Sequence, residues 1–275
     1  MSDTISHIDW ESSKKFLRGI GLGTSIHSAP QMPSTQASAK EAARLGAPHG
    51  AVFVTDYQSD GRGRRDRAWH SIPRVDLTFS TIFRLDVATR HAHLLNLAAA
   101  LAVAAALEKN FTGSRDRVNI KWPNDVLVDS NKICGIICEG SGTVEHLDYA
   151  VLGIGLNVNR TEENLPTPDS PDRPRATSTL VSFGKKLNLP SILADVLAEL
   201  DILSAMITTD DGRRQLVDEY RTRCSTIGKR VRVISDDGET FGEAAGITDD
   251  GELLLDIGGE IVVFDAADVV HARVQ

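Results

Sequence analysis

The sequence predicts an α+β protein in which a mixed, mainly antiparallel sheet carries helices on one face and is followed by a small β-domain. Three observations predict this class. Short β-leaning runs cluster between Val118 and Asn157, and long segments with helical apolar spacing lie on both sides of them. From Lys229 the chain changes to short alternating runs separated by D-D-G and G-G turns. With 275 residues, of which 41% are hydrophobic, the chain can fill one medium domain and one small one.

The first part of the chain should contain a leader, a helix and a series of strands. Residues 1–33 lack sustained periodicity apart from a short turn of helix at Trp10–Leu17, so we expect a loosely held leader. Ser34 or Thr35 can cap a helix that Gly46 should end. The expected strands are short runs rich in β-branched and aromatic residues: Ala51–Thr55, Val75–Phe83, Val118–Lys121, Val126–Val128, Ile133–Glu139 and Tyr149–Asn157.

Three further segments should be helical. Leu94–Lys109 is rich in alanine and leucine and has no breaker, which predicts a helix that packs across the sheet, and Ile192–Ile207 and Arg213–Arg223 have helical apolar spacing. Residues 160–175 carry four prolines and many charges, which predicts a mobile loop at the rim of the site. The strands expected in the small domain are Val231–Ile234, Phe241–Ile247, Leu253–Ile257 and Ile261–Phe264. The predicted domains are therefore 1–33, 34–226 and 227–275.

Composition limits the partners and the compartment. A formal net charge of -8 argues against bulk attraction to nucleic acid or to an anionic membrane. The longest apolar run, Leu97–Leu107, is shorter than the roughly 20 residues that span a bilayer. Cys134 and Cys138 would lie about 13 Å apart on an extended strand, so they cannot bridge each other, and we interpret them as small buried side chains. These features predict a soluble protein of the cytoplasm.

The stretch Asp60–Trp69 reads D-G-R-G-R-R-D-R-A-W and crowds four arginines and two glycines between two expected strands. Glycine lets a ligand approach the main chain closely, and arginine offers a planar fork that matches carboxylate and phosphate oxygens. The stretch therefore predicts an anion site. Arginine-glycine runs also occur in disordered segments that bind nucleic acid, and this alternative stays open on the stretch alone.

A second charged cluster runs from Lys121 to Lys132, where a stiff Trp-Pro turn presents Asn124 beside Asp125. An amide suits a nucleotide base, and a carboxylate suits a Mg²⁺ ion that it shares with substrate phosphates. The same pair could equally form an Asx turn. Lys132 could deliver a point charge to a phosphate or carboxylate, but a lone lysine at a turn is more often simply solvated.

A third element is the strand G-I-G-L-N at 153–157, in which Gly153 and Gly155 remove side chains from one face. Glycine inside a strand often marks the close approach of a ligand or of another backbone, although packing alone could explain it. The sequence has no Walker A motif, no Ser-His-Asp order and no metal-binding His pair. The usual hydrolase and nucleoside triphosphatase interpretations therefore have no residues to support them.

Taken in order, these motifs resemble those of the biotin protein ligases. The matching segments are S-T-Q at 34–36, Q-S-D-G-R-G-R-R-D-R-A-W at 58–69, K-W-P-N-D at 121–125, K-I-C-G-I at 132–136 and G-I-G-L-N-V-N at 153–159. The resemblance implies a catalytic domain like that of class II synthetases and an SH3-like C-terminal β-barrel. It also implies an enzyme that activates biotin with ATP and Mg²⁺ and transfers it to a lysine of a biotin carboxyl carrier domain of acetyl-CoA, acyl-CoA or pyruvate carboxylase.

The resemblance assigns roles to individual residues. Lys132, Arg62 and Arg64 would be catalytic, and Asp125 would help to hold Mg²⁺. The residues implied to bind biotin are Ser34, Thr35, Gln58, Gly61, Arg62, Arg64, Lys132, Gly135, Gly153 and Gly155. Those implied to bind ATP are Arg64, Arg67, Trp69, Lys121, Asn124, Lys132 and Asn157.

Two positions depart from the family pattern, since Gln36 replaces the asparagine of an S-T-N motif and Asp66 replaces a glycine. The Asp66 carboxylate could partly neutralise the loop. The nearest enzyme alternative is a lipoate or octanoyl ligase or transferase, which would not be expected to combine G-R-G-R-R with K-W-P-N-D. The other alternative is a biotin-responsive DNA-binding repressor. Residues 1–33 are too few for a winged-helix module, so we expect a monofunctional ligase that binds neither DNA nor membranes.

Overall fold

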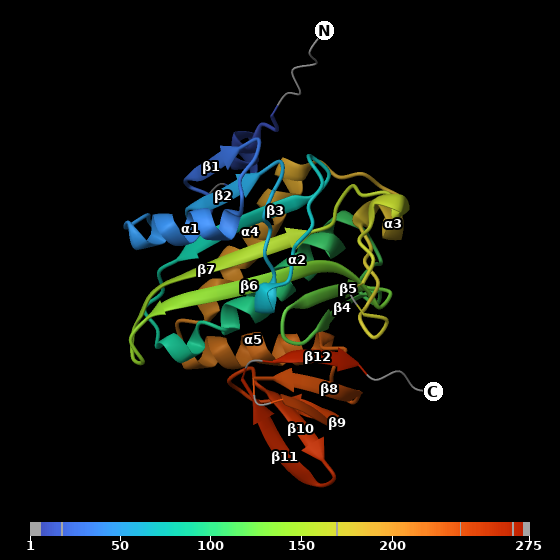
Figure 1. The fold of residues 1–275 in the computed structure, drawn as a ribbon. Coiled ribbons are helices and arrows are strands. Elements are labelled where there is room, and N and C mark those ends of the chain that lie inside the picture. Colours follow the sequence, from blue (N-terminus) through green and yellow to red (C-terminus); the bar gives the residue numbers. More distant parts are fainter. Residues whose placement is uncertain (1–6, 18, 169, 237, 266, 272–275) are drawn as a thin grey trace.

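The computed structural model describes residues 7–17, 19–168, 170–236, 238–265 and 267–271. Its body is a seven-stranded sheet of order β1-β2-β3-β7-β6-β5-β4 (Figure 1). The strands are β1 (Ile26–Ala29), β2 (Val52–Thr55), β3 (Leu77–Phe83), β4 (Val118–Lys121), β5 (Asp125–Val128), β6 (Asn131–Gly142) and β7 (Leu147–Leu156). The pairing of β1 with β2 is parallel and the other pairings in this sheet are antiparallel. The sheet is thus mixed and mainly antiparallel, as the sequence predicts.

The two faces of this sheet have different coverings. The helices α2 (Leu94–Asn110) and α4 (Leu189–Met206) lie behind the sheet in Figure 1, and α5 (Asp210–Arg223) lies along its lower edge. All three share the main hydrophobic core with the sheet. On the opposite face, α1 (Thr35–Arg44) packs its alanines against Ile82 and Val151. Side chains alternate across a strand, so residues of β7 that flank Val151 point into the main core. The face that α1 covers only in part is left for a ligand.

Helix α2 is long and apolar enough to cross a membrane by length and composition, if the short turn η3 (Thr89–His91) is counted with it. However, 78% of its apolar window is buried inside the protein. Its contacts with α4 and with β4 and β6 show that it is a core helix.

The second sheet has order β11-β10-β9-β8-β12 and is antiparallel throughout. Its strands are β8 (Arg230–Ser235), β9 (Gly238–Ile247), β10 (Leu253–Ile257), β11 (Glu260–Phe264) and β12 (Asp268–His271). It lies at the end of the main body, with β12 and β8 nearest to that body in Figure 1. The sequence predicted four of these strands and missed β12, which has only four residues.

The short elements that remain are η1 (Trp10–Phe16), η2 (Arg64–Asp66), η4 (Glu162–Asn164) and α3 (Thr179–Phe183). Local signals predict the ends of the larger elements well. The Ser34 hydroxyl caps α1 by accepting from the backbone N–H of Ala37, and Gly46 follows the helix with a φ of +91°. Asp129 and Ser130 both have positive φ, as a tight turn between β5 and β6 requires.

The expectation of a loosely held leader is wrong for the part of 1–33 that the structure describes. Trp10 is only 1% exposed, and its indole Nε1 donates to Asp56 Oδ1 at 2.8 Å. Strand β1 extends the sheet by pairing with β2. Both contacts reach residues far along the chain, so local sequence patterns carried no signal for them. From residue 7 onward, the described residues of this segment therefore pack against the main domain; residue 18 is not among them.

Candidate functional site

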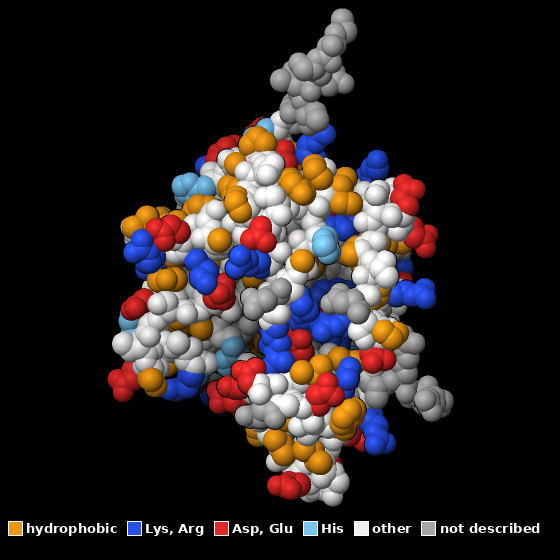
Figure 2. All heavy atoms as spheres, viewed as in Figure 1, with side chains coloured by type: hydrophobic (Ala, Val, Ile, Leu, Met, Phe, Trp, Pro, Cys, Tyr) orange, Lys and Arg blue, Asp and Glu red, His pale blue; other side chains and the backbone are white. Residues whose placement is uncertain are grey.

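A cavity of about 500 Å³ lies on the face of the sheet that carries α1. Figure 2 shows lysine and arginine side chains gathered in a hollow between the main body and the C-terminal sheet. Almost every residue to which the sequence assigned a role lines this one cavity: Ser34, Thr35, Gln58, Arg62, Arg64, Arg67, Trp69, Lys121, Asn124, Asp125, Lys132, Gly135, Gly153, Gly155 and Asn157. The roles themselves stay predictions, but the fold brings the residues together from five separate segments.

Gly61 is the exception, because it is not among the lining residues. A Cβ at this position would lie 2.4 Å from the carbonyl oxygen of Trp69, and Trp69 donates its backbone N–H to the Gly61 carbonyl. Gly61 is therefore needed where the two ends of the arginine loop (60–69) approach each other closely. A direct contact between Gly61 and biotin stays a prediction.

Three of the four arginines in the arginine loop reach the C-terminal sheet. Arg64 donates to the carbonyl oxygen of Ala267 at 3.1 Å, and Arg67 pairs with Asp268 at 2.8 Å. Arg65 pairs with the exposed Asp236 at 2.9 Å. The fourth, Arg62, is exposed and pairs with Asp60. This ordered arrangement favours the anion site over a disordered nucleic-acid-binding segment, while the side chain of Asp66 lies outside the described part of the structure.

Two lysines and one carboxylate form the charged wall of the cavity. Lys132 Nζ lies 2.6 Å from Asp125 Oδ1, and Lys121 Nζ lies 3.9 Å from Asp125 Oδ2. Burial would raise the pKa of Asp125, but Lys132 and Lys121 outweigh it, so the pKa lies below its usual value. Burial lowers the pKa of Lys121, and the neighbouring Lys132 lowers it further. An anion that enters would stabilise the charged form of Lys121.

Asp125 does not make a metal site alone. Among the residues described, no group of three or more His, Cys, Asp or Glu side chains could hold a metal ion. The described residues therefore offer no cage of side chains for Mg²⁺, whereas magnesium bound mainly by nucleotide phosphates needs only one or two protein carboxylates. Mg²⁺ is thus better described as part of an Mg-ATP substrate, and a contact with Asp125 stays a prediction.

The glycines at 135 and 155 make room for Trp69. A Cβ at Gly155 would lie 2.4 Å from Trp69 Cε2, and a Cβ at Gly135 would lie 3.0 Å from Trp69 Cζ3. The indole Nε1 is buried and has no hydrogen-bond partner among the described residues. Lys132 Nζ lies 6.0 Å from the centre of the ring. The indole ring therefore forms the floor of the cavity beside the charged wall.

Uncharged polar groups form the other end of the cavity. The Gln58 amide oxygen accepts from the Thr35 backbone N–H at 2.8 Å and from the Thr35 hydroxyl at 3.1 Å. The Thr35 hydroxyl lies 3.0 Å from that of Ser80, which donates to Gln36 Oε1 at 3.1 Å. A Cβ at Gly153 would lie 2.6 Å from the same Gln36 oxygen, so Gly153 leaves space for this amide. This end suits a polar, uncharged ring.

Sequence reasoning missed several residues of the site. Ser80 looked like an ordinary strand residue, yet it is fully buried and lines the cavity. Arg160, 2% exposed, also lines the cavity and is held by Asp76 with an Nη2 to Oδ2 distance of 2.6 Å. The pair is separated by 84 residues, so no local pattern predicts it. Pro166, Thr167, Pro168, Arg173 and Pro174 line the cavity too, as expected for a loop at its rim.

Comparison with known proteins supports the resemblance seen in the sequence motifs. The Biotin/lipoate A/B protein ligase family matches residues 28–157, and the Biotin protein ligase C terminal domain matches residues 226–272. A biotin–acetyl-CoA-carboxylase ligase of Mycobacterium tuberculosis is 35% identical over 270 residues, which are 97% of this chain and 96% of that protein. The bifunctional ligase/repressor BirA of Bacillus subtilis is 31% identical over 240 residues, 86% of this chain and 71% of that protein.

Solved structures agree on the architecture. A biotin protein ligase from Aquifex aeolicus in complex with biotin and ATP has a TM-score of 0.71 at 23% identity and covers 90% of this chain and 100% of its own. The mixed sheet with its helices and the separate C-terminal antiparallel sheet match the fold of that structure, which confirms the predicted α+β class. The chain belongs to the biotin protein ligase family.

Proposed function

We propose that this protein activates biotin with ATP to biotinyl-5'-AMP and transfers the biotinyl group to a lysine of a biotin carboxyl carrier domain. One observation carries the proposal: a single cavity joins an uncharged hydrogen-bonding end, at Thr35 and Gln58, to a cationic end at Lys132, Lys121 and the arginine loop. Biotin has the same division, with a polar urea ring at one end and a carboxylate at the other.

In the first step a carboxylate oxygen of biotin attacks the α-phosphorus of ATP, and pyrophosphate leaves with its bonding electrons. The two reactants are both anions and repel each other. Lys132 and Arg64 lie where they can offset both charges, and cationic groups held in place before the reaction cost little reorganisation when charge develops. Mg²⁺ enters with ATP and accompanies the pyrophosphate.

In the second step the neutral amine of the acceptor lysine attacks the biotinyl carbonyl carbon, AMP leaves, and the amine loses a proton to solvent. The mixed anhydride would hydrolyse if water reached it. We propose that the arginine loop and the proline-rich rim at 166–168 and 173–174 close over the cavity and exclude water until the acceptor arrives. Asn124 and Asn157 would lie near the adenine ring.

The lipoate or octanoyl alternative is weaker because the second matching family is specific to biotin protein ligases and covers the C-terminal sheet. This sheet contacts the arginines of the site directly. We propose as acceptor the carrier domain of an acetyl-CoA, acyl-CoA or pyruvate carboxylase, and we propose the cytoplasm as the compartment. The Mycobacterium tuberculosis relative, which is named for acetyl-CoA carboxylase, supports the first of these acceptors.

The test is to incubate the full chain with Mg-ATP, a biotin carboxyl carrier domain and either biotin, lipoate or octanoate, and then to weigh the acceptor. The expected result is a gain of one biotinyl group with biotin and no gain with the other acids. A carrier domain whose acceptor lysine is replaced by arginine is the control. Transfer of lipoate or octanoate in preference to biotin would overturn the proposal.

A further inference from the structure

The amide of Gln36 lies in the wall of the cavity, where α1 meets β7, and is 6% exposed. Its nitrogen Nε2 donates to Glu139 Oε2 at 2.9 Å and to the carbonyl oxygen of Val151 at 3.0 Å. Both partners can only accept hydrogen bonds, so they fix which way the amide points. The amide oxygen therefore faces Ser80 and the cavity, and no N–H of Gln36 does.

The polar groups beside Gln36 make more close contacts than they have hydrogens to donate. Three contacts join Gln58 Oε1, the Thr35 hydroxyl, the Ser80 hydroxyl and Gln36 Oε1 in a row. The two hydroxyl groups supply two hydrogens, while both ends of the row are amide oxygens. These residues line the cavity, so the missing donor can come from a molecule bound there. The row has acceptor capacity left for a donor that comes from a ligand.

One donor is available nearby. The Ser34 hydroxyl accepts from Ala37 N but donates to no group within the described ranges. This end of the cavity thus offers unused acceptors beside one hydroxyl hydrogen. A cyclic urea, with two N–H donors and one carbonyl acceptor, complements this set. A dithiolane ring or an alkyl chain has no N–H and would leave the acceptors unpaired, which a buried site penalises strongly.

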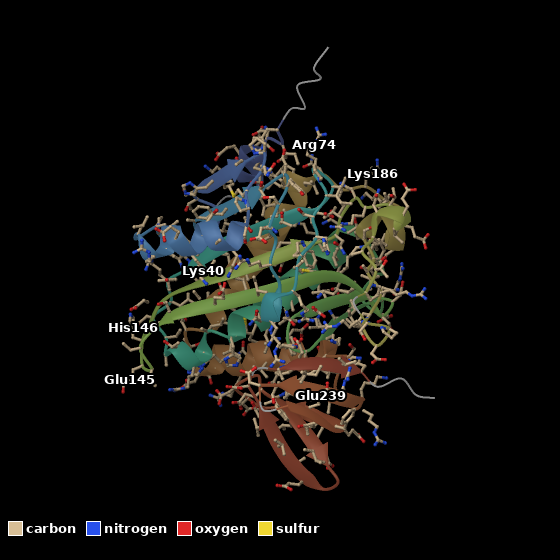
Figure 3. The ribbon with its side chains drawn as sticks, in the orientation of Figure 1. Lys40, Arg74, Glu145, His146, Lys186 and Glu239 are labelled. Atoms are coloured by element: carbon tan, nitrogen blue, oxygen red, sulfur yellow. The ribbon has the colours of Figure 1, made fainter. Side chains whose placement is uncertain are left out.

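Building on the proposed function, we propose that Gln36 is a specificity-determining residue for the urea ring and that Glu139 is the positioning residue that holds its amide oxygen toward the ligand. Glu139 does not line the cavity that is proposed to bind biotin. It lines a second cavity of about 580 Å³, and the Gln36 side chain lines both cavities. The other carboxylate oxygen of Glu139 pairs with Lys40 Nζ at 2.6 Å. Lys40 projects from α1 toward the strands of the sheet (Figure 3).

The pair Glu139 and Lys40 allows a matched comparison, because both side chains are 45% exposed and, of the two, Glu139 is the one whose side chain accepts a hydrogen bond from the Gln36 amide. Glu139→Ala should raise the Kd for biotin about tenfold, since the Gln36 amide loses one of its two constraints. Glu139→Gln should stay within about threefold of the unaltered protein, because its amide oxygen can still accept from Gln36. Lys40→Ala, which breaks only an exposed ion pair, should leave the Kd unchanged.

The measurements are calorimetric titration with biotin and steady-state transfer to a carrier domain, both with the full chain. For Glu139→Ala the KM for biotin should rise about tenfold while kcat at saturating biotin changes less than about twofold, which a general loss of folding would not produce. Gln36→Met keeps the side-chain length without the amide and should show the same selective loss, so it serves if Glu139→Ala folds poorly.

Three results would overturn the assignment: a Kd for Glu139→Ala within twofold of the unaltered protein, an equal loss in Lys40→Ala, or no recovery in Glu139→Gln. The proposed function is tested separately by biotin transfer in the unaltered protein. If that transfer occurs and the variants behave in any of these three ways, the role of Glu139 is wrong and the ligase activity stands.

Discussion

Lys132 is the residue whose removal should affect the chemistry most. It lies 2.6 Å from Asp125 at the cationic end of the cavity, so it can transfer its contact from that carboxylate to an incoming biotin carboxylate or α-phosphate. Lys132→Ala should lower the rate of biotin-dependent pyrophosphate exchange roughly a hundredfold or more, the effect of losing ~2 to 4 kcal/mol of charge-assisted stabilisation. An exchange rate within a few times that of the unaltered protein would contradict this assignment.

His271 should make the folded state sensitive to mild acid. Burial, together with the positive charges of Lys121 and Lys229, lowers the pKa of His271 to about 4, although Asp125 opposes this shift. Between pH 6.5 and about 4 the unfolded chain binds a proton that the folded protein does not, so the free energy of unfolding falls as the pH falls through this window.

His271→Gln should reduce that pH dependence, because glutamine can still bond with the Thr226 hydroxyl and does not titrate. Urea unfolding of both proteins at a series of pH values between 4 and 7 measures the effect. Parallel stability curves across this range would show that another group is responsible.

At the scale of single residues, the sequence predicted which motif residues gather in one cavity, whereas the contacts that hold them were not predicted; the roles of these residues stay predictions. Lys132, Asn124 and Gly155 were found because motifs of fixed spacing carry them, and the cavity contains all three. Ser80 and Arg160 were missed because each acquires its position from a partner 44 or more residues away. A local pattern cannot reveal such a contact, whatever its chemistry.

Among the elements, the arginine loop is the one whose state should depend on ligand. Its cations repel one another, and among the residues described the side chain of Arg62 pairs with the exposed Asp60 alone. Biotinyl-AMP would neutralise the loop from the cavity side. Trypsin cleavage within 62–67 should therefore be fast in the free protein and several times slower with biotin and Mg-ATP, as fragments in mass spectrometry would report. Incubation with ATP but no biotin is the control, and equal rates in all three states would remove the case for a closing loop.

Elements differed in how far the sequence revealed them. Helix α2 was found almost to its ends, because high helix propensity and an unbroken apolar run are local properties. The sequence did not reveal β1 or β12, which become strands by pairing with partners 26 and about 38 residues away along the chain. The turn of helix near Trp10 was expected, whereas its anchor on Asp56 was not.

In the whole molecule, the C-terminal unit supplies the acceptor groups that hold the lysine and arginine side chains of the cavity. Three consecutive residues, at the start of β12 and just before it, accept from three different cations: Ala267 from Arg64, Asp268 from Arg67, and Val269 from Lys121. Asp268 also lies 3.7 Å from Arg173 of the rim. The proposed boundary between 226 and 227 therefore separates two units that complete one site.

Replacing Asp268 should impair the use of ATP. Asp268→Ala leaves Arg67 without its carboxylate partner, so kcat/KM for ATP should fall roughly tenfold as the arginine loses its fixed direction. Asp236→Ala is the matched control, because it frees Arg65 from a fully exposed carboxylate and should change the same constant less than about twofold. An equal kcat/KM for ATP in both variants, or a higher kcat/KM in Asp268→Ala than in the unaltered protein, would show that the C-terminal carboxylate does not orient the loop.

The environment of Trp69 gives the protein an intrinsic optical signal. Of its three tryptophans, Trp10 and Trp122 are each 1% exposed, and their indole nitrogens donate to Asp56 and to the Gly251 carbonyl. Their emission should be nearly constant. Of the three, Trp69 is the one that lines the cavity, beside Lys132, and its indole nitrogen has no partner in the part of the chain that the structure describes. A change in ultraviolet fluorescence on adding substrate therefore reports from the floor of the site, and stopped-flow mixing can follow each substrate as it arrives without any attached dye.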